Sequence, residues 1–403
     1  MLNRLIDHRP ASPCEQYQAA AALSALQPRV HLLVVQPTPF CNINCRYCYL
    51  ASRSNRATMS EQTMDNLFGK LFASGWVRRR LDLAWHAGEP TVLPIDFYRR
   101  AFEIVERHCP AGLEVRHGLQ TNATLLNAAW CDFFRSNRVS VGVSVDGPQR
   151  LNDLNRLNRA GRSTFAKVIG GIRLLRAEQI PFHVITVLSG EGMRSAQELY
   201  DFYASEGIEN VAFNIEESEG EHVSSLQTGP TGWQVYREFL AEFAAIAARD
   251  GRVKLIRELE NGFRSVYQNP RFAPRGTREM ASRNIVVEPF GILSVDYQGN
   301  IATFSPELLG NKSAQYNDFI IGNVNADEFS ELPHSLVLAK MYADIQAGVD
   351  ECREQCPYFD MCGGGQPCNK IAENGTFASS VTNFCRMTRM AVTDLVISGP
   401  HAA

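Results

Sequence analysis

Three cysteines crowd into one short stretch of the sequence, and their spacing suits inorganic chemistry. Cys41, Cys45 and Cys48 lie within eight residues, directly after an apolar run with the pattern of a β-strand. Three thiolates at this spacing can hold one iron–sulfur cube and leave its fourth iron open to a substrate or cofactor. Two alternatives remain, a zinc knuckle lacking one ligand and three buried thiols, although zinc sites normally use a fourth local Cys or His.

A second group of cysteines lies near the C-terminal end, in a stretch rich in glycine. A region this small and turn-rich has little room for a large core of its own, so it is expected to be held together by an inorganic group. Thiolate spacing alone does not distinguish an iron–sulfur cluster from a zinc site with four cysteine ligands. The cysteines of this group are Cys352, Cys356, Cys362, Cys368 and Cys385.

The composition is that of an ordinary globular protein. The chain has 403 residues, of which 45% are apolar and 21% charged, and no apolar run is long enough for a membrane helix. A net charge of −3 offers no basic field for nucleic acid. The N-terminal residues lack the apolar core of a secretory signal, and the odd count of 11 cysteines disfavours a disulfide framework. We therefore expect a cytoplasmic protein that binds neither nucleic acid nor membrane.

The elements that must position these cysteines alternate regularly between strand and helix patterns. Six short β-rich runs, each followed by a segment with helix signals, predict a parallel sheet with right-handed crossovers. The pattern fits an incomplete (β/α) barrel at least as well as an open doubly wound sheet. The runs span residues 31–37, 81–88, 115–123, 139–147, 182–190 and 210–218.

The sequence divides into four parts. Residues 1–30 form an N-terminal extension, and residues 31–245 carry the six βα units. Residues 246–284 are charged and punctuated by proline and glycine, which predicts a connecting region. Residues 285–403 open with a β-hairpin around a Gln-Gly-Asn turn and contain the second cysteine group.

The first cysteine group and the segments that follow it resemble the radical S-adenosylmethionine (SAM) enzymes. The CxxxCxxC spacing with an aromatic residue before the last cysteine is that of the superfamily, and four further segments follow in its order. They are Ala87-Gly88-Glu89-Pro90, Gln120-Thr121-Asn122, Ser144-Val145-Asp146-Gly147-Pro148 and Asn152-Asp153-Leu154-Asn155-Arg156. Ala87 and Asn152 depart from the usual Gly and His. The resemblance implies an α/β fold, a partial (β/α)6 TIM-like barrel.

The resemblance also implies a role for each matched residue. Cys41, Cys45 and Cys48 would ligate a [4Fe–4S] cluster whose open iron chelates SAM. Glu89 would bind the ammonium of SAM and Arg156 its carboxylate, as charge-assisted contacts. The implied SAM contacts are Tyr47, Gly88, Glu89, Asn122, Ser144, Arg156 and Leu188. One electron from the cluster would cleave SAM to methionine and a 5′-deoxyadenosyl radical, which removes hydrogen from an inert C–H bond.

The C-terminal cysteines resemble a SPASM-type auxiliary-cluster domain with part of its ligand set missing. Cys352, Cys356, Cys362 and Cys385 match the outer auxiliary cluster, and Cys368 is a possible substitute for one of them. The hairpin lacks the further cysteines of the family pattern, and Gln366 occupies another cysteine position. We therefore expect one auxiliary [4Fe–4S] cluster, not two.

Within the radical SAM enzymes, the C-terminal segments resemble peptide maturases that form three-residue cyclophanes. Such an enzyme joins an aromatic ring carbon to the β-carbon of a residue two positions away in a ribosomally made precursor peptide. Asp296 and Glu307 are candidate bases for the ring proton, and a flavodoxin- or ferredoxin-type protein is the expected electron donor. The 30 residues before the first strand are too few for a winged-helix domain that binds a leader peptide.

Three alternatives to cyclophane formation stay open. Sulfatase-type oxidation of Ser or Cys is disfavoured because Phe304 and Ser305 stand where sulfatase maturases have a hairpin cysteine and the catalytic Asp. Thioether formation or epimerisation would keep the radical and change the product. A non-catalytic iron–sulfur or zinc protein that binds a partner is the alternative outside enzymes.

Overall fold

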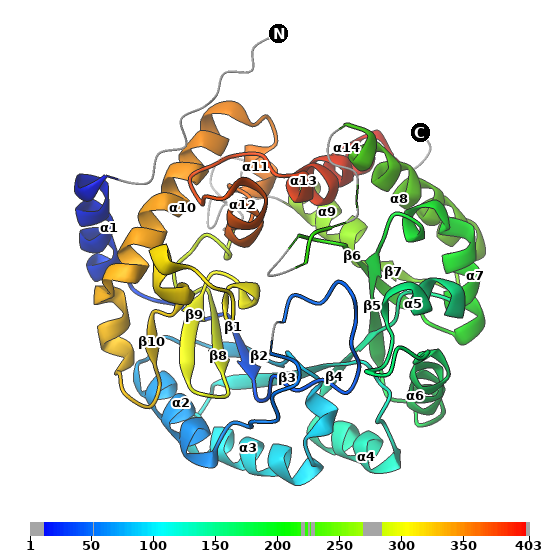
Figure 1. Ribbon diagram of the computed structural model, residues 1–403, viewed down its shortest axis with the longest axis horizontal. Helices are drawn as coiled ribbons and strands as arrows, with labels where there is room; N and C mark the ends of the chain where they lie inside the picture. Colours follow the sequence, from blue (N-terminus) through cyan, green and yellow to red (C-terminus); the bar gives the residue numbers. More distant parts are fainter. Residues whose placement is uncertain are drawn as a thin grey trace.

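A single curved sheet, open on one side, forms the frame of the protein (Figure 1). The computed structural model describes residues 12–50, 52–218, 222–224, 226, 230–268 and 284–399. Within these residues, ten strands form one sheet in the order β10-β9-β8-β1-β2-β3-β4-β5-β6-β7. The strands from β8 to β7 along this order are parallel, and β9 and β10 extend the sheet antiparallel beyond β8.

The six predicted βα units are all present and follow one another around the sheet. Each crossover places a helix on the outer, convex side, as the parallel connections require. The prediction of a partial barrel rather than a doubly wound sheet is confirmed. The strands are β1 (Leu32–Gln36), β2 (Arg80–Trp85), β3 (Glu114–Thr121), β4 (Ser140–Ser144), β5 (Phe182–Leu188) and β6 (Asn210–Ile215). The helices are α2 (Glu61–Ala73), α3 (Ile95–His108), α4 (Ala128–Asn137), α5 (Gln149–Asn155), α6 (Phe165–Ala177), α7 (Ala196–Glu206) and α8 (Pro230–Asp250).

Local sequence signals explain several of these boundaries. The Ser60 hydroxyl accepts a hydrogen bond from the Thr63 amide and caps α2, and the Asn127 side chain caps α4 in the same way. Gly207, in a left-handed conformation, ends α7. The buried faces of the helices and strands meet in one large hydrophobic core, in which the wholly buried Trp85 lies edge-on to Tyr98.

The sheet continues across the predicted boundary at residue 285. The predicted hairpin forms as β8 (Ile292–Asp296) and β9 (Asn300–Thr303), but β8 pairs in parallel with β1, so both strands belong to the barrel sheet. Two short strands, β7 (Leu255–Ile256) and β10 (Gly322–Asn323), form the edges. Of the predicted connecting region, residues 269–283 lie outside the described residues; the rest contains the end of α8, β7 and α9 (Arg257–Tyr267).

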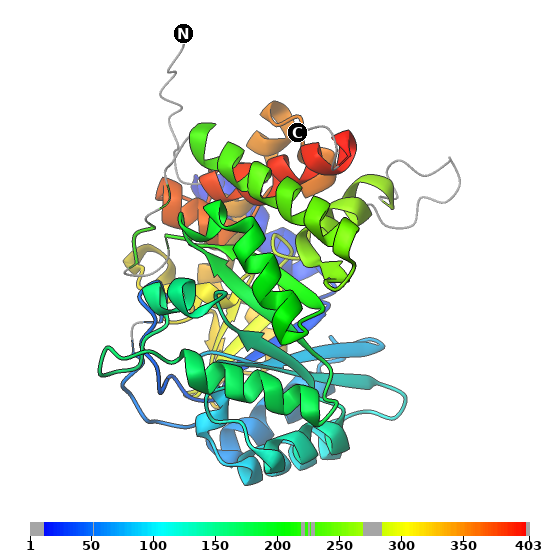
Figure 2. The ribbon, with the colours of Figure 1, turned by 90° about the vertical axis from the view of Figure 1, so that its right-hand side faces the viewer.

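The C-terminal helices pack on the end of the barrel (Figure 2). The last helix lies against α8 and α9, and α1 (Pro13–Ala25) of the N-terminal extension lies along α10. The C-terminal helices are α10 (Leu336–Gln355), α11 (Phe359–Cys362), α12 (Pro367–Asn374), α13 (Asn383–Cys385) and α14 (Val392–Ser398). In the described part of the chain, no helix has the length and apolar character needed to cross a membrane.

Candidate active site

The loop after β1 carries the first cysteine group at the carboxyl ends of the parallel strands, which is the functional end of such barrels. Cys41 and Cys45 are buried, and Cys48 is half-buried beside them. The loop is held from outside: the Asn44 amide donates to the carbonyl of Leu157 at 2.7 Å, in the segment after α5. The structure therefore brings the three predicted ligands together on one anchored loop.

The surroundings of these thiols bear on whether they can ligate iron. Burial raises the pKa of the Cys41 thiol to about 12 and that of Cys45 to about 11, so ionised sulfur at this position requires added positive charge, which iron supplies. The side-chain nitrogen of Asn122 lies 3.9 Å from the Cys41 sulfur, and an Arg156 guanidinium nitrogen lies 3.9 Å from the Cys45 sulfur. Among the described residues, no three His, Cys, Asp or Glu side chains are placed to hold a metal ion as they stand.

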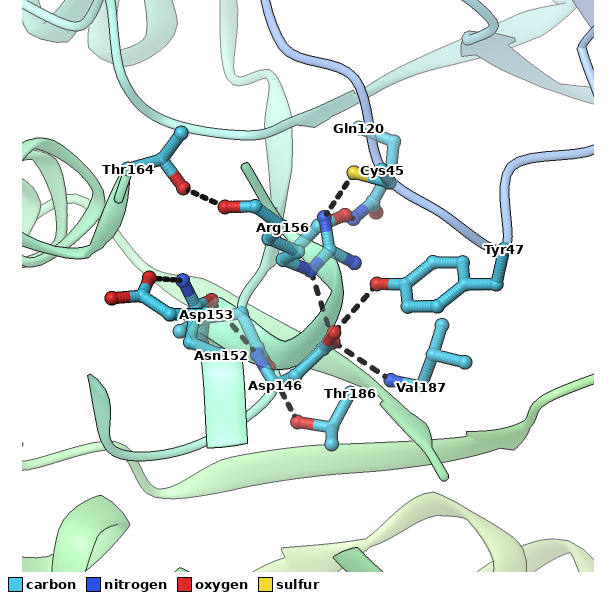
Figure 3. Close-up of polar contacts among 12 residues, drawn as sticks. Cys45, Tyr47, Gln120, Asp146, Asn152, Asp153, Arg156, Thr164, Thr186 and Val187 are labelled. Carbon is cyan, nitrogen blue, oxygen red and sulfur yellow. Dashed lines mark hydrogen bonds and ion pairs between the residues drawn. The ribbon is translucent and has the colours of Figure 1, made fainter. Parts of the chain in front are cut away.

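Asp146, after β4, is the centre of a buried hydrogen-bond network beside this loop (Figure 3). One carboxylate oxygen accepts from the Arg156 guanidinium at 2.9 Å and from the Val187 amide at 3.1 Å, and the other accepts from the Tyr47 hydroxyl at 2.6 Å. The Asp146 amide donates to the Asn152 side chain at 3.4 Å. The predicted SAM contacts Tyr47 and Arg156 thus share one carboxylate, which fixes both side chains.

Glu89 is the centre of a second network, across the sheet from the first. One oxygen of its buried carboxylate accepts from the Thr91 amide and hydroxyl and from the Thr121 hydroxyl, at 2.5 to 3.0 Å. The other accepts from the Asn122 amide at 2.7 Å. Burial raises the pKa of Glu89, and these donors oppose that rise. Because the donors fill most of its acceptor sites, at most one oxygen lone pair is left for an ammonium group.

The turn that carries Glu89 has a strained backbone. Gly88 has a φ of +58°, and a Cβ atom there would lie 2.5 Å from the carbonyl oxygen of Phe40, so only glycine fits. Ala87 has a φ of +69°, a conformation that disfavours its side chain. The Glu89 amide donates to the Phe40 carbonyl at 2.8 Å. The Ala87–Pro90 turn is therefore in direct contact with the backbone of Phe40, the residue before Cys41.

The remaining predicted SAM contacts also lie at strand ends. The Ser144 hydroxyl, at the end of β4, accepts from the Gln120 side chain at 2.8 Å. Leu188, at the end of β5, is wholly buried in the core, and its carbonyl accepts from the Glu216 amide at 3.0 Å. The roles of Ser144, Leu188 and the other residues toward SAM stay predictions.

Four sulfurs of the C-terminal group interact with one another electrostatically. The charges of Cys356 and Cys362 act on both Cys352 and Cys385, and these four are the predicted ligands. Burial is the main cause that raises the pKa of Cys352 and, to about 11, that of Cys385. Cys368 lines the cavities beside Glu307.

A buried lysine accompanies this group. The Lys370 ammonium lies 2.9 Å from the Gly348 carbonyl oxygen and 3.5 Å from the Cys352 sulfur. Within the described residues it makes no ion pair. An isolated buried ammonium is costly, so its environment calls for a nearby anion, and an iron–sulfur cluster on four thiolates is such an anion.

The two candidate bases differ sharply in their surroundings. The Asp296 carboxylate closes the β8–β9 turn, since it accepts from the Gln298 and Asn300 amides and from the Asn300 side chain at 2.9 to 3.0 Å. Glu307 accepts a hydrogen bond from the Ser305 hydroxyl and lines cavities of about 340 and 430 Å³. The geometry favours Glu307 over Asp296 as a base for a bound substrate.

Several residues of the site were missed at the sequence level. Asp146 stands in a matched segment but was given no role, and Thr91, Thr121 and Lys370 gave no recognisable signal. Glu217 follows β6 in an acidic stretch, Glu216, Glu217, Glu219 and Glu221, whose sequence favours a solvated loop. In the structure it accepts a hydrogen bond from Asn369 beside the second cysteine group. Burial and the nearby Glu307 raise the pKa of Glu217 to about 8. Only Asp146 could have been found from the sequence, because it lies in the matched segment that follows the fourth strand.

A partial parallel barrel with three cysteines on its first loop, a buried carboxylate after β2 and a buried guanidinium after α5 defines a class of SAM-dependent iron–sulfur proteins. Residues 35–203 match the sequence model of the radical SAM superfamily, and the chain belongs to that superfamily. It is a radical SAM enzyme, whose cofactors are SAM and a [4Fe–4S] cluster.

Comparison with curated proteins gives relatives of two kinds. The chain is 36% identical over 371 residues, 91% of each chain, to the uncharacterized protein sll1766 of Synechocystis sp.. It is 32% identical over 192 residues to a serine-type anaerobic sulfatase-maturating enzyme of Klebsiella aerogenes, which spans 47% of each chain. A cysteine-type enzyme of Clostridium novyi is 24% identical over 360 residues, 86% of this chain and 90% of the relative.

Two solved structures share the fold over nearly the whole chain. The structure of anSMEcpe with bound AdoMet superposes with a TM-score of 0.72 at 20% identity and covers 92% of this chain and 100% of that one. Streptococcus suis SuiB bound to its precursor peptide SuiA superposes with a TM-score of 0.64 at 15% identity, over 96% and 84% of the two chains. The barrel and the C-terminal helices are therefore arranged as in these proteins.

Proposed function

We propose that this enzyme modifies a ribosomally made precursor peptide in the cytoplasm, forming a carbon–carbon bond between an aromatic ring carbon and the β-carbon of a residue two positions away. The position of Glu307 carries the proposal. Its charge acts on His86, which directly precedes the Ala87–Pro90 turn at the end of β2, and on Glu217 at the end of β6. It also lines a cavity with Cys362 of the second cysteine group. A base in this position would reach a substrate held between the two cysteine groups.

The residues of the barrel would hold the first cofactor pair. Cys41, Cys45 and Cys48 would ligate one cluster, and Arg156 and Glu89 would bind the carboxylate and ammonium of SAM. When bound, this pair supplies the radical that removes a hydrogen atom from an unactivated C–H bond. The raised pKa values of Cys41 and Cys45 and the amide and guanidinium groups beside their sulfurs support this assignment.

The C-terminal residues would complete the oxidation. Cys352, Cys356, Cys362 and Cys385 would hold one auxiliary [4Fe–4S] cluster that accepts an electron, and Glu307 would accept the ring proton. Loss of one hydrogen atom from the β-carbon, bond formation to the ring, and loss of one proton and one electron leave the peptide lighter by two hydrogen atoms. The balance therefore requires both a base and an electron acceptor at the cavity.

The test is co-expression under low oxygen with a short peptide encoded beside this gene, followed by mass measurement. The expected product has lost two hydrogen atoms per site and resists fragmentation between the joined residues, and a Cys41→Ala variant gives none. Glu307→Gln should keep SAM cleavage but lower product formation by roughly 100-fold, the usual contribution of a general base. Glu354→Gln, an exposed glutamate on α10, is the matched control. Full product formation by Glu307→Gln would exclude Glu307 as the base.

A second candidate is oxidation of a Ser or Cys side chain to an aldehyde in a protein substrate. The likeness to the Klebsiella aerogenes and Clostridium novyi sulfatase-maturating enzymes favours it. Phe304 and Ser305 at the positions of the hairpin cysteine and catalytic Asp oppose it. The two products are separated by a hydrazine reagent, which labels an aldehyde and leaves a carbon–carbon cross-link unlabelled.

A further inference from the structure

The loop that carries the first cysteine group is surrounded by arginines and is free of acidic residues. Residues 37–60 and 154–168 contain neither Asp nor Glu, although the chain as a whole has a net charge of −3. The two segments lie side by side, since Ile43 and Asn158 form an antiparallel bridge and the Arg46 amide donates to the Asn155 carbonyl at 3.1 Å. Five arginines of these segments form what we call the arginine surface. They are Arg46, Arg53, Arg56, Arg159 and Arg162.

Two of these arginines connect the surface to the cysteines. Arg53 donates to the Cys45 carbonyl at 2.8 Å, and Arg159 donates to the Cys41 carbonyl at 2.8 Å. The exposed Arg56 stacks over the Phe40 ring at 4.2 Å. Two arginines of the surface are therefore hydrogen-bonded directly to the backbone of two predicted cluster ligands.

The charges of the other arginines are not paired by any carboxylate among the described residues. In the described part of the chain, the side chains of Arg46 and Arg162 are exposed and make neither a hydrogen bond nor an ion pair, and Arg56 makes none besides its ring contact. Unpaired like charges at one place repel one another and favour an incoming anion.

The cavities next to the second cysteine group are lined by charges of both signs. Glu217, Glu258 and Glu307 line them together with Arg257, Arg389 and Lys312, but none of the five surface arginines does. The arginine surface is therefore separate from the cavities, and its exposed cations favour a negatively charged partner of its own.

We propose that the arginine surface docks the electron donor, a negatively charged one-electron carrier of flavodoxin or ferredoxin type. The inference rests on the proposed function, because it places the donor beside the cluster of Cys41, Cys45 and Cys48. In the transfer, a reduced flavin gives up one electron and becomes its one-electron-oxidised form, and the cluster gains that electron. Complementary charge speeds such encounters by roughly 10-fold to 1,000-fold at low ionic strength.

The test measures anaerobic formation of 5′-deoxyadenosine from SAM by the reconstituted full-length enzyme, driven either by reduced bacterial flavodoxin or by dithionite. Arg46→Glu/Arg162→Glu is the informative variant, because neither side chain holds the loop. Arg78→Glu, an exposed arginine before β2 at the opposite end of the barrel, is the matched control. The expected result is a loss of at least about 10-fold with flavodoxin for the double variant, an unchanged rate with dithionite, and no effect of Arg78→Glu.

A second measurement needs no variant. The flavodoxin-driven rate of the unaltered enzyme should fall steeply as salt shortens the Debye length from about 10 Å to about 3 Å, while the dithionite-driven rate stays nearly constant. Equal flavodoxin rates for the double variant and Arg78→Glu, or a flavodoxin rate independent of salt, would overturn the proposal. A loss of precursor-peptide binding, with the flavodoxin-driven rate intact, would assign the surface to the peptide and also overturn the proposal. Failure of SAM cleavage with dithionite would instead refute the proposed function.

Discussion

The two cysteine groups each have a buried cation beside a sulfur, but the charge of that cation is compensated differently. In the barrel, Arg156 lies next to Cys45 and is paired with Asp146 at 2.9 Å. In the C-terminal group, Lys370 lies next to Cys352 and, within the described residues, has no carboxylate partner. The charge of Arg156 is therefore balanced by the chain alone, whereas that of Lys370 becomes balanced only when the C-terminal site holds an anionic group.

The largest expected effect separates the roles of the two groups. Cys41→Ala should abolish 5′-deoxyadenosine formation, because the first cluster loses a ligand that no nearby residue replaces. Cys352→Ala should retain SAM cleavage with dithionite but lose the cross-linked product, because the electron acceptor is damaged. Chromatography of the nucleoside and mass measurement of the peptide give the two readouts, with the exposed Cys14→Ala as control. SAM cleavage that survives Cys41→Ala would contradict the assignment of the groups.

The next effect concerns the free energy of unfolding of the cluster-free protein. Arg156→Met leaves the Asp146 carboxylate buried without its cation, which should cost about 3 to 5 kcal/mol. Lys370→Met removes a buried ammonium that has no counter-charge in this state, so it should leave the stability unchanged or raise it. Denaturant unfolding under anaerobic conditions measures both.

A double variant is the control for this contrast. Arg156→Met combined with Asp146→Asn removes both charges and should recover much of the stability lost by Arg156→Met alone. Equal losses for Arg156→Met and Lys370→Met would show that the two cations are compensated alike, and the comparison between the sites would fail.

With its cluster bound, the C-terminal group gives a third, smaller effect. The Lys370 charge stabilises the electron-rich state of a cluster held by Cys352, so Lys370→Met should shift its reduction potential to more negative values. Lys370→Arg keeps the charge and should change the potential less. A redox titration followed by electron paramagnetic resonance resolves this shift, and the cluster of Cys41, Cys45 and Cys48 in the same sample is the internal reference. An unchanged auxiliary potential would mean that Lys370 has another counter-charge.

The sequence predicted where the functional residues lie better than what they contact. Periodicity located the strand ends, and the family resemblance singled out Glu89 and Arg156; in the structure Glu89 follows β2, and Arg156 follows α5. Their partners depend on strand register and on the path of loops far apart in the sequence, as when Thr121 on β3 donates to Glu89 after β2. The same limit applies to β8, since a strand pattern does not reveal that its neighbour is β1.

The sequence pattern also did not predict the charged residues between the barrel and the C-terminal region. Glu217 stands in an acidic stretch that reads as a solvated loop, and its position beside Asn369 is a property of the folded chain. Residues 219 and 221 of that stretch lie outside the described residues. Lys370 resembles any helical lysine in the sequence, and only the packing of α12 against α10 buries it.

The smallest expected effect tests the contact that joins the two regions. Because Glu217 has a pKa of about 8 in the folded protein, against an ordinary 4.5, the folded state holds its proton over that interval while the unfolded state releases it. Its contribution to stability is therefore present below about pH 4.5 and is lost as the pH rises to about 8. The change is modest because the side chain is half-buried and partly screened by water. Denaturant unfolding across this range should show the decline in the unaltered protein and in Glu61→Gln, an exposed control, but a flatter profile in Glu217→Gln. Parallel profiles for all three would mean that the Glu217 carboxylate is not confined by the packing of the C-terminal region on the barrel.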